Sequence, residues 1–243
     1  MTNNERYNAE RKAQSDLIKR DIERDKVLKE LYQASYNRMQ SQINGFYMRY
    51  ADKEGLSRAE AVKRASEFDV TEYRDRARKA VVEKDFSHGT NQWLRLFNLK
   101  MKVSRLELLK AELRLEIASL ISDVNEVFDE ARESEYLAEF KRQAGILGNS
   151  AVNAVSRMRA ILDADFYGQN FSRRVWGRNG LHASMQKDVF SSLARIFADM
   201  DGFKQERRRL AKKYNTSQAN AQRLLKTEIA RINADTELMM LKE

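Results

Sequence analysis

Basic side chains are most concentrated near the carboxyl end of the chain. Eight lysines and arginines and one carboxylate, Glu206, leave residues 202–226 with a formal charge of +7. Lys204, Arg208 and Lys212 recur every four residues, so a helix places them on one face, as contacts to backbone phosphates require. The segment predicts sequence-independent binding to DNA; the alternatives are a solvated helix and a surface for an acidic protein. The candidate DNA-binding residues are Lys204, Arg207, Arg208, Arg209, Lys212, Lys213 and Arg223.

A second basic group has aromatic residues among its arginines. Phe171 and Trp176 alternate with basic residues, a composition that can stack nucleic-acid bases. In a helical protein such aromatic residues belong more often to the core, and both interpretations stay open here. The arginines of this group are Arg157, Arg159, Arg173, Arg174 and Arg178. No motif that reads base edges is recognisable.

Residues that carry catalysis or bind metals are sparse. His88 and His182 lie far apart, and neither has a second ligand at helical spacing. Phosphate-loop, dinucleotide-binding, nucleophile-elbow and zinc-protease motifs are absent. Most carboxylates have a lysine or arginine three or four residues away, as Glu228 has Arg231, a spacing typical of solvated helix faces. We therefore expect no catalytic residues, metal or cofactor, and an enzyme is the weakest alternative.

The composition favours an all-α fold. The 243 residues include no proline and no cysteine, 42% are hydrophobic, and the formal net charge is +9. Proline is excluded from helix interiors but common in turns, so its absence predicts long helices and few loops. Without cysteine, disulfide scaffolds, thiol catalysis and cysteine-bound zinc are excluded. No apolar run reaches membrane-spanning length and no signal peptide is recognisable, so we expect a protein made in a cytoplasm.

We expect an elongated assembly of helices in three parts, residues 1–50, 51–148 and 149–243. The first part is one amphipathic helix over about residues 7–43. Residues 1–30 carry few large apolar side chains, so we expect them to be stable only against a partner or a symmetry copy. A break near Gly55 and two short helices ending near His88 follow.

The most apolar segment, residues 91–131, predicts a spine helix that carries the core. Gly145 and Gly148 predict a turn after it. The third part predicts a helix ending near Ala164, a loop over residues 165–170, and an interruption between Gly177 and Gly180. Helix starts are predicted at Asn149 or Ser150, at Ser172, and at Thr216 with Ser217.

Several passages resemble a family of tailed-phage proteins. Residues 91–98 (NQWLRLFN) and 104–112 (SRLELLKAE) are similar to the long central helix of minor head proteins. Residues 220–231 (NAQRLLKTEIAR) resemble the terminal signature of the phage Mu protein F-like head morphogenesis family. Residues 140–145 and 171–176 fall between them in the expected order, and the similarity covers most of the chain from about Leu31. The matching signature positions are Arg223, Thr227, Glu228 and Arg231, with Lys226 where arginine is usual.

This resemblance implies a minor capsid protein located in the virion, inside the head and near the portal. Its implied partners are the portal protein, other head proteins and double-stranded DNA, and its roles are head assembly, genome packaging or DNA ejection. Some relatives carry an enzymatic domain beyond the signature, which we do not expect here. From the residues alone, the four signature positions lie within reach of one another along a helix, so a structural helix clasp explains them as well as a functional site does. Self-association through long helices and a cytosolic DNA-binding or scaffolding protein unrelated to virions stay open.

Overall fold

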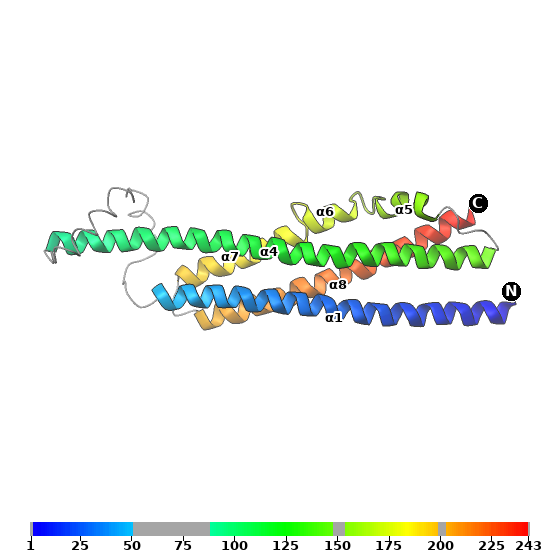
Figure 1. Ribbon diagram of the computed structural model, residues 1–243, viewed down its shortest axis with the longest axis horizontal. Coiled ribbons are helices and arrows are strands. Elements are labelled where there is room, and N and C mark those ends of the chain that lie inside the picture. The colour runs from blue at the N-terminus through cyan, green and yellow to red at the C-terminus, as the bar shows by residue number, and fades with distance from the viewer. Residues whose placement is uncertain (1, 51–87, 148–153, 199–202, 243) are drawn as a thin grey trace. The chain divides into compact units, whose positions relative to one another are not determined.

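The protein is all-α. The computed structural model describes residues 2–50, 88–147, 154–198 and 203–242 (Figure 1). Within these ranges the only strand-like pairing is an isolated bridge between Phe166 and Gln169. The predicted break near Gly55, the two short helices after it and the possible caps at Asn149 and Ser150 lie outside the described residues. The helices are α1 (Asn3–Tyr50), α4 (His88–Leu147), α5 (Ala154–Leu162), α6 (Phe171–Trp176), α7 (Leu181–Ala198) and α8 (Phe203–Leu241).

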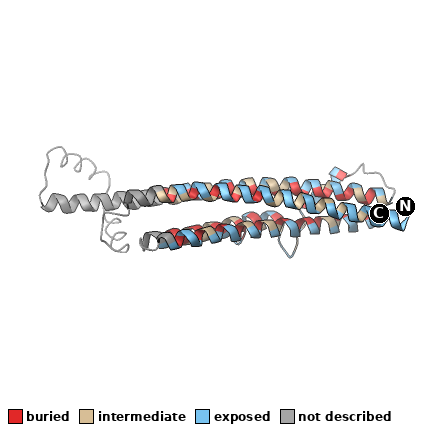
Figure 2. Cartoon of the chain, turned by 90° about the horizontal axis from the view of Figure 1, so that it is seen from below, coloured by how far each residue is buried: buried red, intermediate tan, exposed pale blue. Residues whose placement is uncertain are grey.

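The chain forms two compact units from discontinuous segments. The first contains Met1–Tyr36, Ile117–Val189 and Leu210–Glu243, and the second contains Asn37–Glu116 and Phe190–Arg209. In the first unit, Val124 and Phe128 of α4 are fully buried, as are α8 residues such as Ile232. In the second, Leu113, Met39 and Leu193 are buried. Figure 2 shows buried and exposed residues alternating along the long helices, as amphipathic spacing predicts.

The predicted spine helix is confirmed as α4 and is longer than expected. It spans 60 residues, more than any other helix that the structure describes. It also continues through Gly145, so the prediction of a turn at that glycine is wrong, whereas Gly148 lies outside the described residues. A glycine inside a helix costs about 1 kcal/mol relative to alanine. Burial of the neighbouring Tyr136, Phe140 and Ala144 against Ile232 and Met240 offsets this cost.

Helix α8 is continuous, so the prediction of a new helix start at Thr216 and Ser217 is wrong. The Thr216 hydroxyl donates to the carbonyl oxygen of Lys212 at 2.9 Å, which is a bond within the helix rather than a cap. Ser217 is buried, and its hydroxyl lies 3.1 Å from that of Tyr32 on α1. Both hydroxyls therefore have partners that leave the helix intact.

The predicted interruption between Gly177 and Gly180 is confirmed, and it separates α6 from α7. Helix α6 begins two residues earlier than predicted, because the side chain of Asn170, not Ser172, caps it by accepting from the Arg173 N–H at 3.0 Å. A Cβ at Gly180 would lie 2.7 Å from the Val175 carbonyl oxygen, so this close approach requires glycine. The predicted loop at 165–170 is a tight turn in which Gly168 has φ +75°.

Within the first unit, polar contacts hold the first half of α1 against α4. No residue between Asn3 and Lys26 is buried, and Ile18 and Ile22 are each 60% exposed. Arg20 and Arg24 both donate to Glu135 of α4 at 2.6 Å, and Glu10 pairs with Arg142. The predicted partner dependence of residues 1–30 stays a prediction, but intramolecular ion pairs supply contacts that the apolar pattern lacks.

Glu135 is charged although it is buried. Burial raises the pKa of its carboxyl, but the hydrogen bonds and charges of Arg20 and Arg24 outweigh burial and lower the pKa below the usual 4.5. A carboxylate whose folded pKa is depressed stabilises the protein above its unfolded pKa, and this stabilisation is lost as pH falls through the folded pKa. The attachment of α1 should therefore be sensitive to acid.

We predict that amide-exchange protection of residues 10–27, corrected for the intrinsic exchange rate, is constant from pH 7 to 5 and falls below about pH 4.5. Glu135→Gln should show reduced protection already at pH 7, because the two arginines lose their shared counterion. The matched control Glu133→Gln, an exposed neighbour on α4, should behave like the wild type. Equal protection at pH 3 and pH 7 in the wild type would contradict the prediction.

Candidate functional site

The candidate DNA-binding residues differ in how available their charges are. Arg208, Lys212 and Arg223 are exposed on α8, as is Arg207. Lys204 lies in the same helix, but its side chain is outside the described residues. Since α8 is continuous, the helical spacing assumed in the sequence prediction holds. Arg208, Lys212 and Arg223 pair with no carboxylate of the described residues, so these three can meet phosphates without first breaking an ion pair.

Two of the candidate cations are paired with carboxylates. Glu206, only 4% exposed, accepts from Arg195 of α7 at 2.9 Å and also pairs with Arg209. Lys213 lies 3.0 Å from Asp188 of α7. Asp188 lies outside residues 202–226, so the formal charge of +7 for that segment does not include its carboxylate. The segment therefore presents less net positive charge than its own composition indicates.

The second basic group is not a base-stacking platform at Phe171. That ring is buried, packs edge-on against Phe128 with centroids 5.4 Å apart, and lies beneath the Arg132 guanidinium at 4.4 Å. Trp176 is 40% exposed, and the centroid of its ring lies 5.4 Å from that of the His182 ring. The core interpretation therefore holds for Phe171, whereas Trp176 lies at the surface.

The four signature residues divide into an exposed pair and a buried pair. Arg223 and Thr227 are exposed, whereas Glu228 and Arg231 are 2% and 7% exposed. The prediction that the Glu228–Arg231 pair lies on a solvated face is therefore wrong. The pair is buried because Arg132 of α4, which the sequence analysis did not single out, packs against it. We call Arg132, Glu228 and Arg231 the clasp.

The clasp joins α4, α8 and the end of α5. The Glu228 carboxylate accepts from Arg231 at 2.7 Å and from Arg132 at 3.3 Å. Arg231 also donates to the carbonyl oxygen of Ile161 at 3.0 Å, and Arg132 donates to that of Leu162. The last carbonyls of a helix lack partners inside it and carry partial negative charge. The two guanidiniums thus satisfy the carboxyl end of α5.

Electrostatics keep Arg231, one member of the clasp, ionised. Burial alone lowers the pKa of Arg231, but the hydrogen bonds and charges of Glu228 and Asp235 outweigh it and raise the pKa above its ordinary value. Asp129 completes the set by accepting from Arg132 at 3.1 Å. Since these side chains bond one another and backbone carbonyls, the arrangement is suited to holding helices together.

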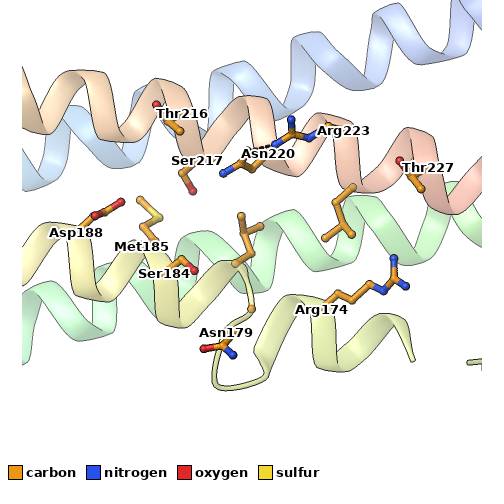
Figure 3. A pocket seen from close by; sticks show the side chains of 13 residues that line it. Arg174, Asn179, Ser184, Met185, Asp188, Thr216, Ser217, Asn220, Arg223 and Thr227 are labelled. Carbon is orange, nitrogen blue, oxygen red and sulfur yellow. Dashed lines mark hydrogen bonds between the residues drawn. The ribbon is translucent and has the colours of Figure 1, made fainter. Parts of the chain in front are cut away.

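A polar groove of about 360 Å³ lies between the α6–α7 break and α8 within the first unit (Figure 3). One wall carries Arg174, Asn179 and the first turns of α7; the other is a stripe of α8 that includes Asn220, Arg223 and Thr227. Leu181, Met185 and Leu224 add apolar surface. We call this the α6–α8 groove. Sequence reasoning missed it because its residues come from three separate segments.

The structure describes one of the two histidine side chains. His182 contacts Trp176, and the side chain of His88 is not described. Across the described ranges, no three acidic or histidine side chains are placed to hold a metal ion. The same ranges contain no helix with the length and apolarity that a membrane span needs.

Comparisons of the chain with protein-family models, curated proteins and solved structures found no match.

We predict that Glu228→Gln lowers the free energy of unfolding by about 3 to 5 kcal/mol, because it leaves two buried guanidiniums without their shared counterion. Urea unfolding followed by circular dichroism measures the change. Glu133→Gln removes a carboxylate from an exposed position and should change the value by less than about 0.5 kcal/mol. If the two variants are equally stable, the clasp does not hold the helices together.

Proposed function

We propose that the chain is a minor capsid protein of a tailed phage, associated with the portal inside the head. It acts in head assembly and in genome packaging or DNA ejection, and it contacts DNA without sequence preference. The observation that carries this proposal is the ordered resemblance of five passages to head morphogenesis proteins. The alternative is a cytosolic helical DNA-binding or scaffolding protein.

The roles of the resembling passages in the fold support the proposal. Phe140, Phe171 and Glu228 come from three different passages, and all are buried in the first unit. Phe171 packs against Arg132, to which Glu228 is also bonded. A resemblance that involved only exposed charged residues would be weak support for the proposal, because any charge-rich helix contains similar patterns of charged residues. Here it includes residues on which the packing of the unit depends.

The charge of the chain supports a contact with DNA. Its formal net charge is +9, and Arg208, Lys212 and Arg223 are exposed cations. Phosphates carry no sequence information, so cations that meet only phosphates bind all duplexes alike. An acidic surface on a portal or another head protein is the competing partner for these residues.

We predict that particles purified from cells that make this chain contain it at a few to a dozen copies, as a portal-associated protein requires. Quantitative mass spectrometry against an isotope-labelled standard of the chain measures the number. Treatment of intact particles with protease provides the control, because a protein inside the head is protected. Absence of the chain from purified particles would favour the cytosolic alternative.

We predict that binding to duplex DNA weakens with salt, and that each cation contacting a phosphate contributes about 0.9 to the slope of log affinity against log salt. Neutralising Arg207, Arg208 and Lys212 with glutamine should flatten the slope by up to about 2.7 and weaken binding to all sequences equally. A filter-binding titration measures both effects.

The matched control replaces Lys29, Lys141 and Lys187, three exposed lysines outside the basic segment, with glutamine. It removes the same charge and should leave the slope near the wild-type value. If the basic-segment variant keeps the wild-type slope but fails to enter heads, the segment binds an acidic protein instead of DNA.

A further inference from the structure

We infer that the α6–α8 groove binds a phosphate group. Its lining brings two arginines, two asparagine side chains and the first turns of α7 around one cavity in the first unit. The identity of the molecule that carries this phosphate rests on the proposed function. If the protein contacts DNA, the phosphate belongs to the backbone of the duplex. A free phosphate ester offers the same chemistry.

The two arginines approach the groove from opposite walls. Arg174 belongs to α6, where one donor bonds the Phe166 carbonyl oxygen and the guanidinium lies 4.9 Å from the Phe166 ring. Arg223 belongs to α8, where one donor bonds the Asn220 side-chain oxygen. A guanidinium has five N–H donors, so these contacts orient each group and use only part of its capacity. Oriented guanidiniums match phosphate oxygens well.

Neutral donors extend the same chemistry around the groove. Because the Asn220 oxygen accepts from Arg223, its amide nitrogen remains as a donor on the α8 wall. Asn179 lies on the opposite wall, and Figure 3 shows Asn220 and Asn179 on the two sides of the cavity. The exposed hydroxyls of Ser184 and Thr227 can donate as well. Donors on several sides suit a tetrahedral oxyanion better than a planar carboxylate.

Helix α7 adds partial positive charge at the groove. Leu181 starts this 18-residue helix and lines the cavity, and the first turn contains no acidic residue. The preceding residue is Gly180, which has no side chain to cap the N–H groups of that turn. The amino end of a helix attracts anions, which supports the attraction by the two arginines.

One carboxylate, that of Asp188, lines the groove, and it forms an ion pair with a lysine. Asp188 lies 3.0 Å from Lys213, so its charge is largely balanced by that ion pair. Figure 3 places Asp188 at one end of the cavity and Arg174 with Thr227 toward the other. The two arginines therefore determine the sign of the potential where the phosphate is expected to bind.

The test follows the full chain by nuclear magnetic resonance during titration with inorganic phosphate at constant ionic strength. We expect saturable shifts of the Leu181 and Ser184 amides and of the Arg223 Nε–H. Replacing both Arg174 and Arg223 with glutamine should weaken phosphate binding at least tenfold. Arg223→Gln alone changes an exposed residue and should give an intermediate loss, so the test does not depend on the folding of the double variant.

The matched control, Lys29→Gln with Lys187→Gln, removes the same charge outside the groove and should bind phosphate within twofold of the wild type. Competition by a duplex without terminal phosphates identifies the DNA backbone as the source. Competition only by a nucleoside monophosphate identifies a free phosphate ester. Absence of saturable shifts, or wild-type affinity in the double variant, overturns the inference without bearing on the presence of the chain in particles.

Discussion

The arrangement of α4, α5 and α8 depends on one buried carboxylate shared by two buried arginines. Glu228 neutralises Arg132 and Arg231, and the guanidiniums extend from it to the last carbonyls of α5. Apolar helix faces tolerate small shifts, because one methyl group can replace another at a contact. Buried charged groups do not tolerate such shifts, because a buried charge that loses its counterion strongly destabilises the fold. The clasp therefore opposes sliding of these helices along one another.

The same arrangement recurs elsewhere in the chain. Each of three carboxylates, with at most 5% of its side chain exposed, faces two arginines. Two of these sets lie in the first unit and one lies in the second. Charged residues make up 33% of the sequence, so some of the contacts between helices involve charged side chains. Where such contacts are buried, a carboxylate shared by two arginines satisfies the charges. The three sets are Glu135 with Arg20 and Arg24, Glu206 with Arg195 and Arg209, and Glu228 with Arg132 and Arg231.

Long helices were predictable here, and buried charges were not. Absence of proline and apolar spacing predicted α1 and α4, because both are local properties. The helix start expected at Thr216 and Ser217 failed because tertiary contacts and bonds within the helix satisfy those hydroxyls. A glutamate three residues before an arginine can form an ion pair on an exposed helix face or in a buried site such as the clasp. The spacing therefore does not distinguish a buried pair from an exposed one. One signal was present: Arg132 and Glu135 continue the three- and four-residue spacing of Val124 and Phe128 along the buried face of α4.

The contact between Tyr32 and Ser217 joins residues 185 positions apart in the chain. Since ribosomes add about 5 to 20 residues per second, roughly ten to forty seconds separate the synthesis of the two residues. During that interval the side chain of Tyr32, buried in the finished protein, lacks its contacts with Tyr214 and Ser217 of α8. The nascent chain therefore carries α1 before α8, one of the helices that α1 contacts in the finished protein, exists. A chaperone or a second nascent chain that binds this helix competes with α8 for the same surface.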